Sequence, residues 1–212
     1  MRFHRPLDQI LDSSVKVRIL RFLCRKGGEW SGRRIAKELA MNPVTAHAAL
    51  RELYRATVLD LRKVGNNFLY SLRDEHFLVR EVLRPLFEQE TKAHEWLLKR
   101  LRHALDPRLR SEIVTMALYG SLAQQREQPT SDIDLLFLVK SQRSKQKVQQ
   151  ALERLWETVT KEFGNPLSPY VNTVEEARRK FRRRLPLFRN ILDHHQLIWG
   201  EPLERVLRAH AA

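Results

Sequence analysis

A Gly-Ser pair and two closely spaced aspartates are the residues of this sequence best suited to chemistry. Gly120 and Ser121 are followed, after nine intervening residues, by Ser131 and the pattern Asp132-x-Asp134. On a strand the two aspartates project from one face, roughly 6 to 7 Å apart at ~3.3 Å per residue. Because carboxylates this close repel each other, the pair predicts a bound Mg²⁺, which takes one or two protein carboxylates and completes its octahedron with water and phosphate oxygens.

The Gly-Ser pair predicts contacts with a phosphate group. Gly120 allows the backbone to approach a phosphate closely, and Ser121 can donate its hydroxyl there, beside free amides of a short following helix. We therefore expect Gly120 and Ser121 to bind a phosphate, and Asp132 and Asp134 to bind the metal.

The elements around these motifs read as an alternation of strands and helices. Apolar residues 113–118 lead into the Gly-Ser pair and residues 133–139 surround and follow the acids, so both segments predict buried strands. Residues 142–163 have apolar positions at helical spacing, and residues 166–173 follow as a further strand.

The segment GSLAQQREQPTSDIDLLFLV resembles the signature of the DNA polymerase β-like nucleotidyltransferase superfamily, in particular its minimal nucleotidyltransferases. The resemblance rests on the Gly-Ser pair, the spacer, the Asp-x-Asp and both apolar strands, and it spans about residues 113–200. It implies a mixed sheet with flanking helices, Mg²⁺ as cofactor, and an NTP as substrate or ligand. It also implies that Gly120, Ser121 and Ser131 bind the nucleotide and that Asp132 and Asp134 are catalytic.

Members of this superfamily usually present a third carboxylate from a later strand. Here the alternating face of residues 166–173 offers Ser168, Tyr170 and Asn172 and no acid. With Asn172 in the third position the site loses its base, since an amide accepts no proton at neutral pH. We therefore expect Mg²⁺-NTP binding with poor transfer, and Asn172→Asp to increase transfer. The alternatives are a base from Glu175 or Glu176, or one brought by the acceptor.

The first third of the chain has the pattern of three helices and a β-hairpin. Helices are predicted from about residue 13 to Gly27, over 31–39, and from Asn42-Pro43 onward, where Asn42 suits the N-cap. Two alternating segments then flank Gly65-Asn66-Asn67, a hairpin signal. This order resembles a winged helix-turn-helix of transcription regulators over about residues 7–74.

That resemblance implies duplex DNA as a partner. The third helix would enter the major groove, and the hairpin would reach the backbone or minor groove. The residues expected to contact DNA are Thr45, His47 and Arg51 on the helix and Arg62, Lys63 and Asn66 on the hairpin. A small helical domain used only for dimerisation is the alternative.

Composition agrees with a polyanionic partner. The 212 residues include 39 Lys and Arg against 25 Asp and Glu, a net charge of +14 that attracts nucleic acid at long range. Cys24 is the single cysteine, which excludes an internal disulfide. Because no apolar run reaches ~18 residues and the first residues lack a signal-peptide pattern, we expect a cytoplasmic protein without a membrane partner.

The sequence therefore predicts an α+β protein with three parts. Residues 1–74 form a winged helix-turn-helix, residues 75–110 form linker helices that either mediate a homodimer or pack on their own domains, and residues 111–212 form a nucleotidyltransferase-like mixed sheet with flanking helices. Pro85 should kink the linker helix or end its first piece.

Two classes of function remain open from the sequence. In the first, the DNA-binding protein is also a Mg²⁺-dependent enzyme that moves a nucleoside monophosphate from an NTP to the hydroxyl of an unknown acceptor. The acceptor could be a protein or an RNA, since some minimal nucleotidyltransferases are antitoxins that nucleotidylate a toxin. In the second, it is a transcription regulator whose nucleotidyltransferase domain binds nucleotide as a sensor, without turnover.

Overall fold

The chain divides into two units, Met1–Ala93 and His94–Ala212, in the computed structural model, which describes residues 3–103 and 105–209. The boundary falls within the predicted linker of residues 75–110. Each unit has a hydrophobic core of its own, the second with one on each face of its sheet.

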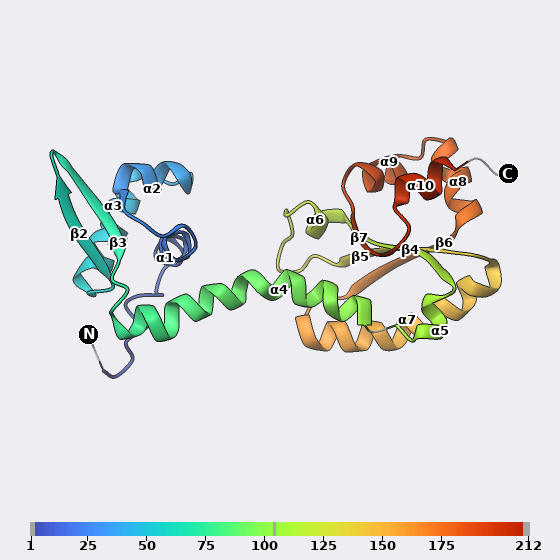
Figure 1. Ribbon diagram of the computed structural model, residues 1–212, viewed down its shortest axis with the longest axis horizontal. Helices are drawn as coiled ribbons and strands as arrows, with labels where there is room; N and C mark the ends of the chain where they lie inside the picture. Colours follow the sequence, from blue (N-terminus) through green and yellow to red (C-terminus); the bar gives the residue numbers. More distant parts are fainter. Residues whose placement is uncertain (1–2, 104, 210–212) are drawn as a thin grey trace. The chain divides into compact units, whose positions relative to one another are not determined.

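The first unit is a winged helix-turn-helix, as the sequence predicts (Figure 1). The antiparallel strand order β1-β3-β2 makes the hairpin β2-β3 the wing. The elements, in chain order, are α1 (Ser14–Lys26), β1 (Trp30–Ser31), α2 (Gly32–Glu38), α3 (Pro43–Arg55), β2 (Leu59–Val64) and β3 (Asn67–Leu72).

Short polar side chains start the three helices of this unit. Ser13, Ser31 and Asn42 each accept a hydrogen bond from a backbone N–H in the first turn of α1, α2 and α3, and Pro43 occupies the first turn of α3. The apolar stripes of the helices then pack against one another, with Leu20 and Leu50 fully buried between them. This core fixes which face of α3 remains outside.

The linker region begins with a π-helical turn, η1 (Val79–Leu83), which leads directly into α4 (Arg84–His103). The N–H of Arg84 bonds to the carbonyl of Val79, five residues earlier, and Pro85 follows with no N–H to donate. Pro85 thus lies in the first turn of α4, directly after the π-helical turn, and the helix continues through it; the predicted end of a first piece at Pro85 is wrong. The α4 helix runs across the boundary between the two units.

The second unit contains a mixed four-stranded sheet of order β6-β5-β4-β7, in which only β5 and β6 run parallel. This confirms the predicted mixed sheet with flanking helices. The elements are α5 (Pro107–Arg110), β4 (Ile113–Tyr119), α6 (Gly120–Ala123), β5 (Ile133–Val139), α7 (Gln142–Phe163), β6 (Leu167–Thr173), α8 (Val174–Arg182), α9 (Pro186–Asp193), β7 (Gln196–Gly200) and α10 (Leu203–Arg208).

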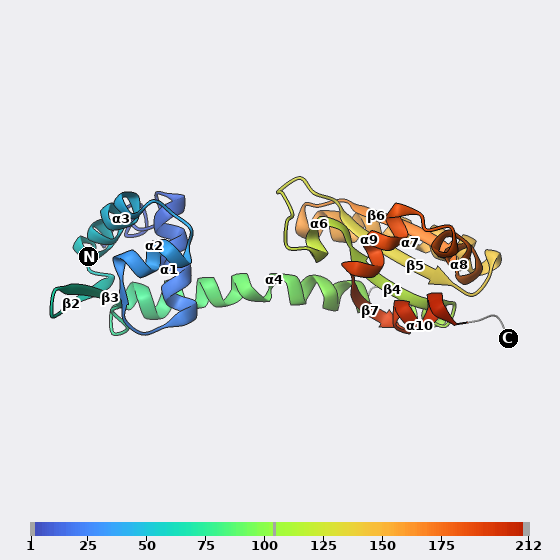
Figure 2. The ribbon, with the colours of Figure 1, turned by 90° about the horizontal axis from the view of Figure 1, so that it is seen from above.

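Helices cover both faces of this sheet (Figure 2). Helix α7 and the last turns of α4 pack on one face, against side chains that include Met116 and Phe137. Helices α8, α9 and α10 pack on the other face, against Leu136 and Leu138. By strand alternation, Asp134 belongs to this second face. No helix in the described part of the chain is long and apolar enough to cross a membrane.

Candidate functional site

The Gly-Ser pair and the Asp-x-Asp meet at one end of the β4-β5 pair. Tyr119, the last residue of β4, lies opposite Asp134 of β5, and Gly120 follows at once. Gly120 has φ +76°, and a Cβ there would overlap Oδ2 of Asp134 and lie 2.9 Å from its Cγ. Glycine is therefore required twice here, for its backbone conformation and for the space that the Asp134 carboxylate fills.

The two aspartates form a negatively charged pair. Burial raises the pKa of Asp134 above its usual value, the Ser168 hydroxyl lowers it, and the charge of Asp132 raises it again. Within the described residues, neither carboxylate has a salt-bridge partner. Hard oxygen donors that no cationic side chain of the described residues neutralises are ligands of the kind that Mg²⁺ prefers.

The pKa of Tyr119, which lies opposite Asp134, is shifted by the same negative charge. Burial raises the pKa of Tyr119 to about 12, and the charges of Asp134 and Tyr170 add to the rise. The phenol therefore stays neutral and cannot serve as a base at physiological pH. Its place at the strand end makes it part of the wall around Asp134.

Ser121 and Ser131 lie on the two sides of the loop that joins the motifs. Ser121 is half-buried in the four-residue helix α6, and its carbonyl accepts the N–H of Arg126 at 2.9 Å. Oγ of Ser131 accepts the N–H of Gln128 at 2.9 Å, while Asn165 donates to its carbonyl at 2.9 Å. The hydroxyl proton of Ser131 stays free to donate, so its role in nucleotide binding stays a prediction.

The expectation that Asn172 stands beside the acids is wrong. In the parallel β5-β6 pairing, Asp134 lies opposite Ser168, whereas Asn172 lies opposite Leu138 at the other end of the strands. Asn172 is 1% exposed, and its Oδ1 accepts a hydrogen bond from Nζ of Lys180 at 2.6 Å. The alternation of side chains along β6 showed which residues share the face of Asp134. Only the register between β5 and β6 shows that Ser168 is the one beside it.

Neither glutamate at the start of α8 supplies the missing base. Both lie beyond Thr173, which pairs with Val139 at the end of β5 away from Asp134. The carboxylate of Glu176 caps α8 by accepting the N–H of Thr173 at 2.9 Å, and it pairs with Lys145 at 2.8 Å. Among the described residues no cluster of three metal-ligating side chains forms, so the acidic site consists of two carboxylates.

The six predicted DNA-contacting residues of the first unit are all exposed, but they differ in whether their side chains already contact other residues of the protein. Thr45, Arg51 and Lys63 are exposed, and Asn66 lies in the exposed hairpin turn. The side chains of the remaining two predicted residues, His47 and Arg62, have protein neighbours.

The ring of His47 packs over Gly32, where a Cβ would lie 2.5 Å from the Cε1 atom of the ring. Nε of Arg62 donates to Oε1 of Glu29 at 2.7 Å. No feature of the sequence showed that these two side chains already have partners, because Gly32 and Glu29 are distant along the chain.

Val44 was not among the predicted contact residues, but it is 77% exposed in the first turn of α3.

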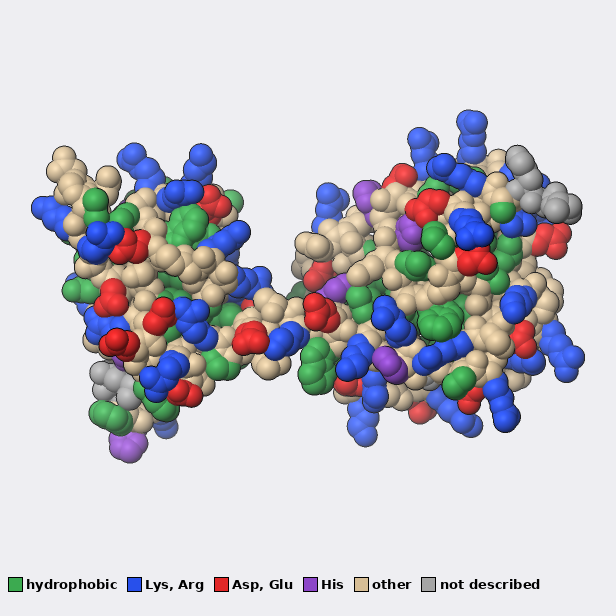
Figure 3. Space-filling model, viewed as in Figure 1, with side chains coloured by type: hydrophobic (Ala, Val, Ile, Leu, Met, Phe, Trp, Pro, Cys, Tyr) green, Lys and Arg blue, Asp and Glu red, His purple; other side chains and the backbone are tan. Residues whose placement is uncertain are grey.

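Lys and Arg side chains are spread over the visible faces of both units, with acidic side chains between them (Figure 3). The positive charge of the chain therefore acts over a broad surface.

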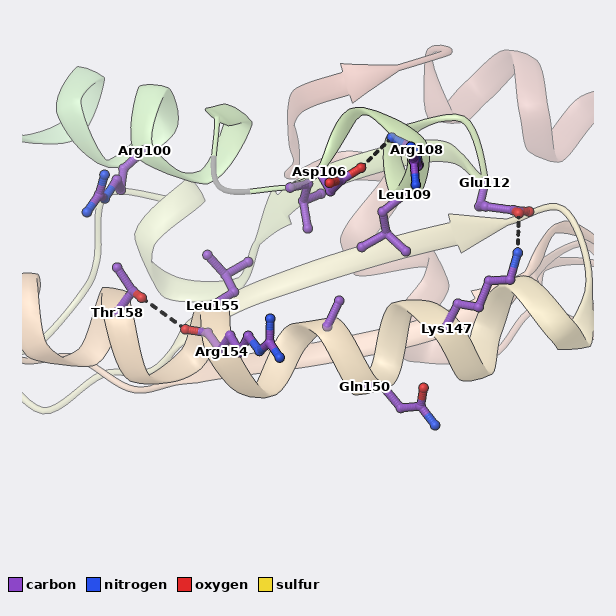
Figure 4. A pocket seen from close by; sticks show the side chains of 12 residues that line it. Arg100, Asp106, Arg108, Leu109, Glu112, Lys147, Gln150, Arg154, Leu155 and Thr158 are labelled. Atoms are coloured by element: carbon purple, nitrogen blue, oxygen red, sulfur yellow. Dashed lines mark hydrogen bonds and ion pairs between the residues drawn. The ribbon is translucent and has the colours of Figure 1, made fainter.

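A separate pocket of about 690 Å³ lies on the α7 side of the sheet, away from the face of Asp134. Leu109 points toward α7 from α5, Leu155 points away from α7 on the same side, and Glu112 pairs with Lys147 (Figure 4). Because it contains neither the Gly-Ser pair nor the aspartates, this pocket is not the acidic site.

Comparison with known families confirms the resemblance of the second unit. Residues 104–168 match the family model described as "Polymerase beta, Nucleotidyltransferase", a span that includes the Gly-Ser pair, both aspartates and Ser168. No curated protein matches the chain significantly.

Solved structures with partial similarity include two from Mycobacterium bovis and one complex. A fragment of a possible transcriptional regulatory protein is 23% identical, with 42% of this chain and 88% of that chain covered and a TM-score of 0.33. A homodimeric winged helix-turn-helix DNA-binding domain is 23% identical, with 44% and 80% covered and a TM-score of 0.33. A toxin-antitoxin with AMP-PNP is 14% identical, with 54% and 81% covered and a TM-score of 0.33. Because these TM-scores are low, the fold of the first unit is assigned from its own strand pairing and order of elements.

Proposed function

We propose that this chain is a DNA-binding regulator whose second unit binds a nucleoside triphosphate with Mg²⁺ and transfers the nucleotidyl group slowly. The observation that carries the proposal is the close approach of the Gly120 backbone to the Asp134 carboxylate at the end of the β4-β5 pair, because it brings the Gly-Ser pair and the Asp-x-Asp motif together at one strand end. The family match over residues 104–168 supports the same reading.

The residues of the site divide the work of binding. Asp132 and Asp134 would hold the cation, while Gly120, Ser121 and the amides of α6 would hold phosphate oxygens. When bound, Mg²⁺ supplies charge stabilisation to the phosphoryl group. We expect the Ser131 hydroxyl to add a donor to the same nucleotide.

The transfer reaction requires a base, and the described residues place no third carboxylate beside Asp132 and Asp134. The oxygen of an acceptor hydroxyl would bond to the α-phosphorus, and the bond from that phosphorus to the bridging oxygen would break, leaving the electron pair on pyrophosphate. The hydroxyl proton must pass to a base, and loss of a general base typically costs ~10² to 10⁴ in rate. Nucleotide binding then persists while transfer is slow, which favours the regulator over the efficient enzyme.

For the first unit, we propose that α3 and the wing bind duplex DNA. Support comes from the exposed Thr45, Arg51 and Lys63 on a domain with an excess of cations. The full chain should bind random-sequence duplex at low salt, with an affinity that falls steeply as salt rises. Absence of binding at low salt would refute this part of the proposal.

The two classes of function are separated by incubating the full chain with α-phosphate-labelled NTPs, Mg²⁺ and cell lysate. We expect filter-retained nucleotide and little covalently labelled protein or RNA, with both signals lost in the Asp132→Asn/Asp134→Asn double variant. Rapid labelling of an acceptor that depends on Asp132 would show an efficient nucleotidyltransferase instead, and would identify the acceptor.

A further inference from the structure

We propose that Ser168 occupies the place of a third metal-binding carboxylate, so that the acidic site holds one divalent cation with its nucleotide rather than two. The inference rests on the proposed Mg²⁺-NTP binding and assigns its stoichiometry to one residue. The juxtaposition that carries it is the pairing of Ser168 with Asp134 across the parallel strands β6 and β5.

The register leaves little freedom for the side chain of residue 168. Ile133 pairs with Leu167, and both are buried in the core on the α7 side. Asp134 and Ser168, the next residues, must therefore project to the opposite face, on strands about 4.8 Å apart. A carboxylate at position 168 would complete a triangle with Asp132 and Asp134.

A hydroxyl at this point cannot replace that carboxylate. Two cations about 4 Å apart, the spacing in two-metal sites, repel each other and need negative ligands between them. Asp132 and Asp134 supply two negative charges, and Ser168 supplies none. It therefore offers no charge to hold a second cation and accepts no proton from an acceptor hydroxyl at neutral pH.

The rest of β6 offers no substitute within the described residues. Tyr170, two residues further along the same face, accepts a hydrogen bond from Lys180 at 2.8 Å. Asn172 accepts from the same ammonium group. The strand therefore has an ammonium group at the end where Asn172 lies, and a neutral hydroxyl beside the acids.

The same strand offers a matched pair of variants. Ser168→Asp adds a carboxylate beside Asp134, whereas Asn172→Asp adds one four residues away, where Lys180 neutralises it. Both variants change the net charge equally. Only the first should change metal binding at the acidic site.

The test counts Mn²⁺ bound to the full chain in the presence of α,β-methylene-ATP, by the electron paramagnetic resonance of free Mn²⁺. We expect one Mn²⁺ per bound nucleotide in the wild type and in Asn172→Asp, and two in Ser168→Asp. With ATP itself, Ser168→Asp should raise transfer or hydrolysis by at least about 10²-fold, the range of a general base. Ser168→Glu provides a second carboxylate variant with a longer side chain.

Each outcome assigns a cause. Two Mn²⁺ bound to the wild type would overturn the role of Ser168, and so would a single Mn²⁺ bound to folded Ser168→Asp and to folded Ser168→Glu. Either result would leave the proposed Mg²⁺-NTP binding intact. Absence of Mn²⁺-nucleotide binding in the wild type would instead overturn the proposed function on which the inference rests. Binding of a second Mn²⁺ by Asn172→Asp as well would also contradict the role of Ser168, because the added charge alone would then explain the effect.

Discussion

The two units hold their candidate functional groups in opposite ways. In the first unit, the candidate DNA contacts are side chains such as Arg51 and Lys63, which project into solvent from a helix and a hairpin. In the second unit, the backbone of Gly120 and the carboxylate of Asp134 fill one another's space at a strand end. The difference teaches that a substitution should have graded effects on DNA binding in the first unit and all-or-none effects on nucleotide binding at the acidic site of the second.

Gly120→Ala should show the largest effect. The new Cβ would overlap Asp134 and add the strain of a positive φ, which costs about 1 to 3 kcal/mol. We expect the rise in melting temperature that Mg²⁺-ATP causes in the wild type, by binding the folded state alone, to disappear. Thermal melts with and without Mg²⁺-ATP measure both consequences.

Gly164→Ala is the matched control for this variant. Gly164, after α7, also has a positive φ, +80°, but a Cβ there would have nothing within 4 Å. It should lose stability through strain while it keeps the Mg²⁺-ATP shift. Equal loss of the shift in both variants would contradict a nucleotide site at Gly120, because strain alone would then account for the loss.

Glu176→Gln should produce the next largest change, in stability. Burial favours the neutral acid, but hydrogen bonds from Lys145, Gln142 and the Thr173 N–H outweigh it and lower the pKa of Glu176 to about 2. Because this folded pKa lies below the unfolded value of 4.5, the stabilisation is complete above pH 4.5 and disappears as the pH falls toward 2.

The expected loss in Glu176→Gln is about 2 to 3 kcal/mol at neutral pH, reduced from the full shift because the side chain is partly exposed. Chemical denaturation between pH 7 and pH 2.5 measures it. A difference from the wild type that stays constant over this range would contradict an electrostatic origin.

Arg51→Ala and Lys63→Ala test the graded behaviour of the first unit. If Arg51 contacts a base through two hydrogen bonds, its loss should weaken a selected duplex by about 1 to 3 kcal/mol and relax the preference for that site. Lys63→Ala should weaken all sequences alike, as expected for a phosphate contact. Fluorescence anisotropy with selected and scrambled duplexes separates the two, and equal effects on both duplexes for Arg51→Ala would remove its base-reading role.

Glu29→Gln should have the smallest effect, and its sign is informative. The variant releases Arg62 from its exposed ion pair and allows it to reach a phosphate. One added phosphate contact should steepen the dependence of log affinity on log salt by about 0.9. An unchanged slope in Glu29→Gln would show that Arg62 lies outside the DNA-binding surface.

The sequence was a good guide to the fold because local signals and the fold agree. Asn42 and Pro43 start α3 as predicted, and a turn of Gly65 and Asn66, within the predicted hairpin signal, joins β2 and β3. The two apolar segments around the Gly-Ser and Asp-x-Asp motifs form the predicted strands β4 and β5. Each of these features depends on residues close together in the chain.

The parts that the sequence did not predict depend on contacts between distant residues. Asn172 and Ser168 lie on the same face of β6, so alternation could not choose between them, and strand register did. The Glu29 carboxylate that pairs with Arg62, and Gly32 beneath His47, are equally invisible to a local pattern. Long-range pairing therefore separates the predictable scaffold from the details of both candidate sites.

Calorimetric titration of the full chain with ATP, GTP, CTP and UTP in Mg²⁺ tests the central claim most directly. The account predicts saturable binding of at least one of them at one site per chain, lost in EDTA and in Asp132→Asn/Asp134→Asn. Gly164→Ala should bind as the wild type does. Identical binding in the double variant, or in EDTA, would contradict a metal-nucleotide site at Asp132 and Asp134.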